Sequence, residues 1–442
     1  TSSSFFCDQL TMGKGAQQGL TSSLVGEAAS KTVLIDGELY EVGEFKHPGG
    51  SIIKQFVGHG DATEAFREFH GRSTKADKML KALPHAPAPP LPKERAFNGR
   101  EALSEDYAAL RKELQAEGFF APHAGEVAYR LAEIVVMHLV GVFLLMWAAA
   151  QPRTWSSVAA FAAGVATLGC VSGRCGWVMH EAGHYSLTGA IKTDRLLQNI
   201  LYGVGCGMSA AWWRNQHNKH HATPQKLKHD VDLDTLPLVA FNAAVADKAR
   251  GVVKLWLKFQ AVLFVPVSCL LVALGWQFFL HPRHSVRTKK YGELLCYALR
   301  YALIFGVVLR DFSAPTTLAT NLLYDQLAAS YIFTNFALSH THLPVTNPDE
   351  YLHWVEYAAN HTTNLQPGPI CNWWMANLNF QIEHHLFPSM PQFRHKLIAP
   401  RVKALFDKHG LTYDVRPYFT CLYQTLNNLH TVGTHASAPK AD

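Results

Sequence analysis

Residues 212–225, WWRNQHNKHHATPQ, place three imidazoles within five positions, at His217, His220 and His221. On a helix, positions i, i+3 and i+4 share one face, so His217 can point together with His220 or His221 at one ion. Two other stretches have the same helical spacing: HEAGH at residues 180–184 and QIEHH at residues 381–385. Three such boxes predict a metal site.

The histidines of the three boxes outnumber the ligands of a single ion. They are His180, His184, His217, His220, His221, His384 and His385. A structural zinc site closes with about four ligands, so this set suits two ions. Imidazole without a cysteine partner suits iron, copper, nickel or zinc. The alternative is ordinary surface or core histidines, which the neighbouring membrane-length apolar segments disfavour because unpaired polar groups are costly there.

The N-terminal part of the chain predicts a haem site. Residues 32–40, TVLIDGELY, have strand residues on both sides of an Asp-Gly pair, which indicates a hairpin. HPGG follows from His47, and its turn lets the backbone pass close to a flat ligand. Short helices are predicted over residues 51–57 and 61–69. His47 and His70 flank these helices and suit the two axial ligands of a haem, with His59 as the weaker rival.

Composition indicates a membrane protein with a cytosolic face. Apolar residues make up 48% and charged residues 17% of the 442, the latter below the globular average of about 25%. The net charge of +6 without a dense Lys/Arg run suits a membrane-facing surface and predicts no nucleic-acid partner. The eight cysteines lack CxxC spacing and are interpreted as reduced thiols.

A span needs about 20 apolar residues. Four full spans are predicted, over residues 134–150, 156–173, 294–309 and 316–338. Residues 259–280 are predicted to be re-entrant or interfacial, because an even number of crossings returns the third box to the side of the first two. The basic run 281–290 is cytosolic by the positive-inside rule. In the alternative, 259–280 spans and 294–309 does not. Residues 196–211 are predicted to lie in the interface.

HPGG, HEAGH, HNKHH and QIEHH, in this order, resemble the motifs of front-end fatty-acyl desaturases with a fused cytochrome b5 domain. The resemblance covers residues 31–420. Within that family the chain is similar to algal and protist enzymes that insert a Δ5 double bond into C20 polyunsaturated acyl chains. Gln381 opens the third box where many relatives of other regiochemistry have His. The resemblance implies haem b on His47 and His70, two non-haem irons on the box histidines, and O2 as co-substrate.

The resemblance also implies partners and a location. The substrate is a fatty-acyl chain carried as a CoA or phospholipid ester, and NADH-cytochrome b5 reductase is the electron donor. The protein is expected in the endoplasmic reticulum membrane as a multi-pass protein, with the lipid bilayer around it and both metal centres on the cytosolic side.

The family pattern implies iron ligands beyond the boxes. His361 is the best candidate, with His340 and His342 behind it; ordinary interfacial histidines are the alternative. Gln381 is expected beside the irons as a ligand or hydrogen-bond donor, and is the predicted catalytic residue.

Four aspartates outside the boxes are also considered. Asp230, Asp232 and Asp234 either orient ligand imidazoles or are solvated charges, and the second interpretation is favoured. Asp325 lies in an apolar run and is expected at the membrane interface.

The predicted fold is multi-domain: a small α+β cytochrome b5-like haem domain, then an all-α integral membrane desaturase domain with about four transmembrane helices and a cytosolic histidine-box cap. The predicted boundaries are a disordered N-terminus over 1–30, the haem domain over 31–83, a Pro-rich linker and amphipathic membrane-surface helix over 84–130, the desaturase domain over 131–425 and a flexible tail over 426–442. Alternative functions are Δ6, Δ8 or Δ4 desaturation, a di-iron hydroxylase or acetylenase, and a non-enzymatic haem electron carrier.

Overall fold

The computed structural model describes residues 31–58, 60–88, 100–233 and 235–437. The predictions for the N-terminus up to residue 30, for His59, for Asp234, for residues 89–99 of the Pro-rich linker and for residues 438–442 lie outside the described residues.

The N-terminal domain contains a three-stranded antiparallel sheet in the order β1-β2-β3. The strands are β1 (Thr32–Ile35), β2 (Glu38–Glu41) and β3 (His85–Pro87). Asp36 and Gly37 both have positive φ, as the hairpin signal requires, so the predicted hairpin is confirmed. β3 comes from the Pro-rich stretch and pairs with the free edge of β2, where a proline is tolerated. The sheet therefore runs beyond the predicted boundary at residue 83.

Three short helical segments complete this domain: η2 (Gly50–Gln55), a 3₁₀ helix, α1 (Thr63–His70) and α2 (Thr74–Ala82). Val33, Ile35 and Tyr40 of the sheet form its core together with Val42 and Ala62. The two histidines predicted to bind haem flank η2 and α1. His47 lies before η2, and His70 is the last residue of α1.

Helix α3 (Glu101–Ala116) has the predicted amphipathic pattern but a different neighbour. Its apolar face, which includes Leu103 and Leu114, is fully buried against α15 (Trp354–His361), α17 (Gln381–Leu386) and α18 (His395–Lys408). The predicted membrane-surface position is therefore wrong, because the rest of the polypeptide already covers the face that a bilayer would have covered.

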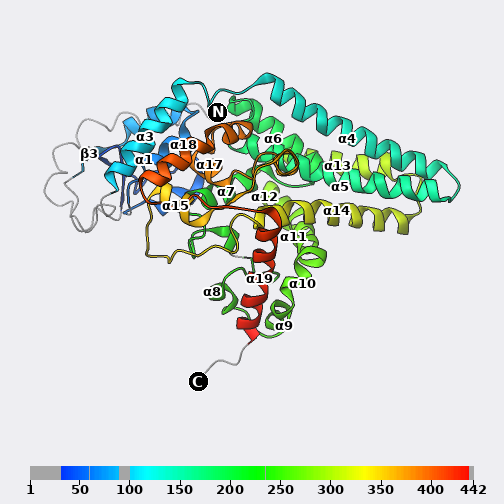
Figure 1. Cartoon of the computed structure of the whole chain (residues 1–442). Coiled ribbons are helices and arrows are strands. Elements are labelled where there is room, and N and C mark those ends of the chain that lie inside the picture. The colour runs from blue at the N-terminus through cyan, green and yellow to red at the C-terminus, as the bar shows by residue number, and fades with distance from the viewer. Residues whose placement is uncertain (1–30, 59, 89–99, 234, 438–442) are drawn as a thin grey trace.

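Four long helices extend together toward one side of the molecule (Figure 1). They are α4 (Ala124–Ala150), α5 (Trp155–Gly183), α13 (Tyr291–Leu303, continued by a π turn to Val308) and α14 (Ala314–Ala337). α5 and α14 approach closely because small residues line their contact: a Cβ on Gly173 would lie 2.0 Å from the Tyr331 ring. Many apolar side chains of α4, including Leu139 and Phe143, are exposed, as expected for a surface that faces lipid.

Four described helices are long and apolar enough to cross a membrane: Ala124–Ala150, Trp155–Gly183, Gln260–Arg287 and Tyr291–Val308. This set keeps three of the four predicted spans. It replaces 316–338 by a helix over the segment predicted to be re-entrant, because α14 carries many polar residues. The continuous helix 260–287 comprises α10 (Gln260–Leu263), α11 (Cys269–Gly275), α12 (His281–Arg287) and two π turns between them. In Figure 1, α10 and α11 run across the direction of α4 and α5.

Asp325 of α14 is inside the helix group rather than at an interface. Its carboxylate lies 3.2 Å from the Arg300 guanidinium of α13 and accepts a hydrogen bond from Asn321 at 3.1 Å. The predicted interfacial position is wrong, because pairing with Arg300 offsets the cost of burial.

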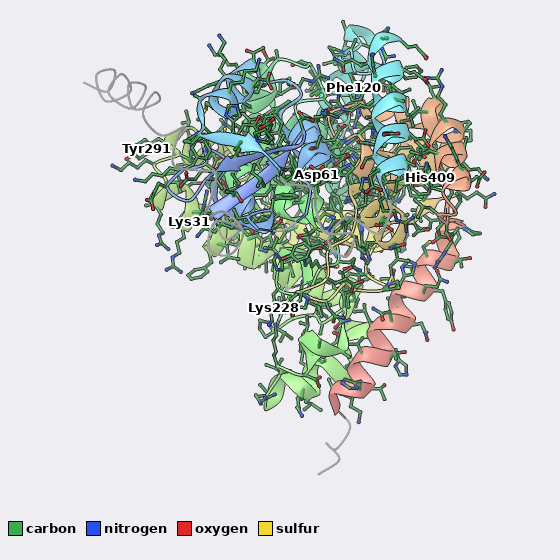
Figure 2. The ribbon with its side chains drawn as sticks, turned by 90° about the vertical axis from the view of Figure 1, so that its left-hand side faces the viewer. Lys31, Asp61, Phe120, Lys228, Tyr291 and His409 are labelled. Atoms are coloured by element: carbon green, nitrogen blue, oxygen red, sulfur yellow. The ribbon has the colours of Figure 1, made fainter. Side chains whose placement is uncertain are left out.

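The C-terminal segment is also ordered differently from the prediction. α19 (Tyr418–Ser437) continues through most of the predicted flexible tail and, drawn in red, runs beside the green helices toward the lower end of the molecule (Figure 2). Leu429 is fully buried, and Asn428 donates hydrogen bonds to the carbonyls of Phe241 and Thr341 at 2.8 and 2.7 Å. The helix also packs against α9 (Val252–Lys258) and α10.

The remaining described elements lie between the helices given above. They are α6 (Ile191–Cys206), α7 (Ala210–Ala222), η3 (Val231–Leu233), α8 (Ala243–Ala246), α16 (Pro369–Trp374), η7 (Gln392–Arg394) and the two-stranded parallel pair β4 (Asn364–Leu365) and β5 (Val415–Arg416).

Candidate metal centre

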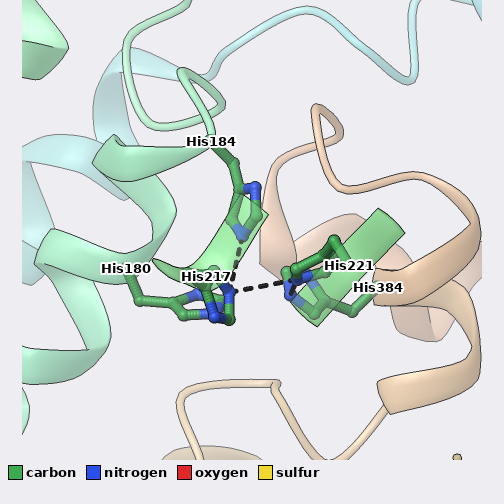
Figure 3. A group of neighbouring side chains, drawn as sticks. All are labelled: His180, His184, His217, His221 and His384. Carbon is green, nitrogen blue, oxygen red and sulfur yellow. Dashed lines mark hydrogen bonds between the residues drawn. The ribbon is translucent and has the colours of Figure 1, made fainter. Parts of the chain in front are cut away.

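Five histidines from the three boxes form one buried group. It consists of His180, His184, His217, His221 and His384, of which His217 is only partly buried, and one ring nitrogen of each lies within 4.8 Å of those of the others. His217 Nε2 lies 3.1 Å from His184 Nε2 and 3.0 Å from His221 Nε2 (Figure 3). Two imidazole nitrogens bound at about 2.1 Å to one ion, with about 90° between the bonds, lie about 3 Å apart. The spacing therefore fits a shared metal ion.

Three further histidines form a second buried group: His220, His340 and His385. Their ring centres are 4.8 to 5.1 Å apart. The two groups are neighbours, because the His385 ring stacks on the His221 ring at 4.2 Å. Seven box histidines and one histidine from outside the boxes thus make two adjacent donor sets, as a pair of ions would need.

The second group is oriented by protein acceptors behind it. His220 Nδ1 lies 2.9 Å from Asp230 Oδ2, and His340 Nδ1 lies 2.8 Å from the His361 carbonyl oxygen. An acceptor on Nδ1 fixes the tautomer that leaves Nε2 free for a metal. Asp230 is buried, so the favoured interpretation of it as a solvated charge is wrong, whereas the Asp232 side chain is 58% exposed.

The first group is oriented by residues that sequence reasoning did not identify. The Gln392 side-chain amide lies 2.9 Å from His180 Nδ1, and its Oε1 has no hydrogen-bond partner among the described residues. Turned about its axis, this amide accepts from Nδ1–H and frees His180 Nε2. The Gln392 backbone N–H donates to buried Glu181, which also pairs with Arg130. No spacing signal marks Gln392, because five residues of irregular chain separate it from the end of α17.

Glu383, inside the third box, has a supporting role. Its carboxylate accepts hydrogen bonds from Asn364 Nδ2 at 2.8 Å and from the Tyr413 hydroxyl. The Asn364 side chain in turn accepts from the Ile382 backbone N–H at 2.9 Å. These bonds tie α17 to β4 and so fix the direction in which His384 and His385 point. Burial raises the pKa of Glu383 to about 7.

Burial also sets the charge of the ligands. It lowers the pKa of His184 and of His340 to about 3, and it holds the pKa of His217 well below the usual value. These imidazoles are therefore neutral and have a lone pair for a metal at neutral pH. For His220, burial lowers the pKa, but the carboxylates of Asp230 and Asp232 outweigh it and raise the pKa to about 9.

Of the predicted additional ligands, the structure brings one into a histidine group and leaves the others outside. His361 joins neither group, because its Nε2 lies 2.6 Å from Thr346 Oγ1 and its Nδ1 2.9 Å from the Pro344 carbonyl. His340, placed behind it in the prediction, belongs to the second group. His342 joins neither. Gln381 is buried at the first position of α17, and its side chain lies beside His340.

The haem ligands predicted in the N-terminal domain face each other. The His47 and His70 ring centres are 5.9 Å apart, with the ring planes perpendicular. Two imidazoles that bind a haem iron from opposite sides have ring centres about 6 Å apart. His70 Nδ1 lies 3.0 Å from the Phe66 carbonyl oxygen, which directs its Nε2 toward His47's side of the site. The pair therefore fits a bis-histidine haem.

Family comparisons agree with both sites. The fatty acid desaturase family model matches residues 154–417, and the cytochrome b5-like haem/steroid-binding domain matches residues 24–86. The chain belongs to the fatty acid desaturase family, as a front-end desaturase with a fused cytochrome b5 domain. It is a membrane oxidoreductase, and its family implies both haem and iron.

Relatives cover nearly the whole chain. An acyl-lipid (8-3)-desaturase of Rebecca salina is 56% identical over 418 residues, 94% of each chain. An acyl-lipid (8-3)-desaturase of Thraustochytrium sp is 48% identical, over 96% of this chain and 97% of its own. Fatty acid desaturase 3 of Homo sapiens is 27% identical over 92% of this chain and 91% of its own.

Proposed function

We propose that this front-end desaturase inserts a cis double bond between an existing double bond and the carboxyl end of a C20 polyunsaturated acyl chain, at the Δ5 position. The observation that carries the di-iron chemistry is the pair of adjacent buried histidine groups. The sequence resemblance supports Δ5. The two most similar relatives given above are named acyl-lipid enzymes, which favours a lipid ester over the CoA ester.

The reaction removes two hydrogens from an unactivated CH2–CH2 unit. Two hydrogens, two electrons, two protons and one O2 give the double bond and two waters, and an iron pair supplies the oxidising power when bound. The chain's own residues supply two donor sets. One set is His180, His184, His217, His221 and His384; the other is His220, His340 and His385.

Other residues prepare these donors. Asp230 and the His361 carbonyl hold the rings of the second set in the tautomer that binds metal. Gln381 lies against His340 and is proposed to tune that set. Burial of both sets keeps bulk water away from the reacting carbons.

The electron source is the fused haem. We propose that His47 and His70 bind haem b, and that an NADH-dependent cytochrome b5 reductase reduces it. The 5.9 Å separation of the two rings supports this arrangement.

For the membrane topology, we propose that α4, α5, α13 and α14 cross the bilayer, and that α10–α12 lies along it. Between box helix α7 and Gln260, the described helices have at most seven residues, too short to cross. At the other end, Glu293 accepts hydrogen bonds from Ser209 Oγ at 2.5 Å and from the Ala211 backbone N–H at 2.8 Å, at the start of α7. Short helices thus lead from α7 to the start of α10, and the end of α12 lies beside the start of α7. We therefore place both ends of α10–α12 on the face of the metal centre, the proposed cytosolic face of the endoplasmic reticulum.

The function is tested by expression in a host of defined lipid composition, fed with one C18 and one C20 polyunsaturated acid. The proposal predicts a new Δ5 double bond in the C20 chain, located by mass spectrometry of derivatised products. A product that gains one oxygen instead of losing two hydrogens would identify a hydroxylase. A new double bond only in the C18 chain would contradict the proposed substrate.

A further inference from the structure

The N-terminal domain rests on the metal centre through the segment that follows His47. Gln55, the last residue of η2, donates a hydrogen bond to the His229 carbonyl at 3.2 Å and accepts one from Thr223 Oγ1 at 3.3 Å. Thr223 directly follows α7, the helix of the second histidine box. One side of the haem site is thus attached to that box.

The other side of the haem site is attached to the third box through Tyr107. α1 ends at His70 and carries Glu68, which is almost completely buried. The Tyr107 hydroxyl lies 3.0 Å from Glu68 Oε1 and 2.7 Å from the Leu386 carbonyl oxygen, and Leu386 directly follows His385 in α17. A phenol has one proton, so it donates to one of these oxygens at a time while touching both. Tyr107 therefore joins the helix of a haem ligand to the helix of two metal ligands.

The contact face of α1 carries charged groups beside the apolar Ala65 and Phe69. Glu64 lies 3.7 Å from His353 Nε2, Glu68 accepts from Arg111 Nε at 2.5 Å, and Arg72, just beyond α1, donates to the Ser389 carbonyl at 3.0 Å. Glu64 and Glu68 are spaced four apart, so they share one side of α1, and Arg72 follows the end of the helix. Buried charges hold a single arrangement, because a shift that separates them leaves desolvated charge without a partner. Such an interface suits a domain docked in one position better than a carrier that moves between partners.

We propose that Tyr107 is a positioning residue for electron delivery: it fixes α1 against α17, so that the haem transfers electrons to the metal centre from one docked arrangement. This rests on the proposed function. In each transfer a ferrous haem becomes ferric and one iron of the pair gains the electron. The NADH-dependent reductase then reduces the haem again, and two such transfers serve each double bond.

The test uses the full chain, loaded with haem and iron, in phospholipid nanodiscs. Tyr107→Phe removes the hydroxyl but keeps the ring, which stacks on Phe387 at 5.3 Å. Tyr129→Phe, at a tyrosine that is 53% exposed on α4, is the matched control. The haem is reduced beforehand, then mixed with O2 and the C20 acyl lipid, and its reoxidation is followed by stopped-flow absorbance. We expect reoxidation about tenfold slower in Tyr107→Phe, because small misplacements of reacting groups have large kinetic effects.

Several readouts separate positioning from loss of structure. In Tyr107→Phe the haem spectrum, the haem midpoint potential, the iron content and the rate of haem reduction by the reductase stay at wild-type values. Gln55→Ala, on the opposite side of the haem, slows reoxidation in the same way without touching Tyr107. Reoxidation within twofold of wild type in both variants overturns the positioning role. Absence of desaturated product from the wild-type chain overturns the proposed function instead.

Discussion

The two histidine groups of the metal centre are held in different ways. In the first group, the Nδ1 atoms of His221 and His384 have no hydrogen-bond partner among the residues that the structure describes. In the second group, the Nδ1 atoms of His220 and His340 face the Asp230 carboxylate and a backbone carbonyl, and only the Nδ1 atom of His385 has no partner among the described residues. The first group therefore depends more on helix spacing and on the metal for its order. The second is pre-oriented by the protein, and its donors are strengthened from behind.

The largest expected effect comes from removing one member of each group. We expect His217→Ala and His220→Ala each to abolish desaturation and to lower bound iron, because each removes a ligand that no neighbour replaces. Product analysis and iron determination measure the two effects, and the haem spectrum stays unchanged. His430→Ala, at an exposed histidine of α19, is the control. Full activity in either box variant contradicts the di-iron assignment.

A smaller effect is expected at the carboxylate that distinguishes the second group. Asp230→Asn keeps the shape but removes the charge behind His220, so turnover or iron affinity falls about 10–100-fold. Asp232→Asn, at an exposed neighbour 3.4 Å from the same ring, is the matched control and costs much less. Equal losses in the two variants would show that general charge, and not the hydrogen bond, matters.

A substitution at Gln381 tests whether this residue, beside His340, affects the metal chemistry of the second group. A Gln side chain offers a carbonyl oxygen and two N–H donors, whereas His offers a stronger metal donor. We expect Gln381→His to lower turnover about 10–100-fold, with membrane insertion, haem content and iron content largely retained. Activity is compared at matched expression. Wild-type turnover would falsify a direct role of Gln381.

The smallest effect is expected at His361, whose ring lies outside both groups. His361→Ala leaves the backbone carbonyl that supports His340 in place but leaves Thr346 without its partner, at a cost of about 1–3 kcal/mol in stability. Iron content per folded protein stays at the wild-type value, whereas His340→Ala loses iron. Thermal unfolding and metal analysis of the two variants distinguish these roles. Equal iron loss in both would make His361 a ligand.

Much of the site was predictable because its motifs are local. Periodicity within each box places histidines on one helical face, and the hairpin signal before HPGG places His47 at the start of the haem site. The wrong predictions concern the neighbours of individual segments and side chains in the folded protein. α3 packs against protein instead of lipid, α19 is ordered by its contacts with α9 and α10, and Asp325 is paired inside the helix group. Each depends on a partner distant in sequence.

The sequence alone was enough to predict three boxes of metal ligands and two histidines that frame a haem, because residue type and helical spacing are properties of short segments. Only the tertiary structure decided how the ligands divide. His220 and His221 are adjacent, yet they belong to different groups, as do His384 and His385. Successive helical residues point about 100° apart, so a His-His pair faces two ions. Which ion each faces depends on how α5, α7 and α17 pack, and His340 joins them only through the fold.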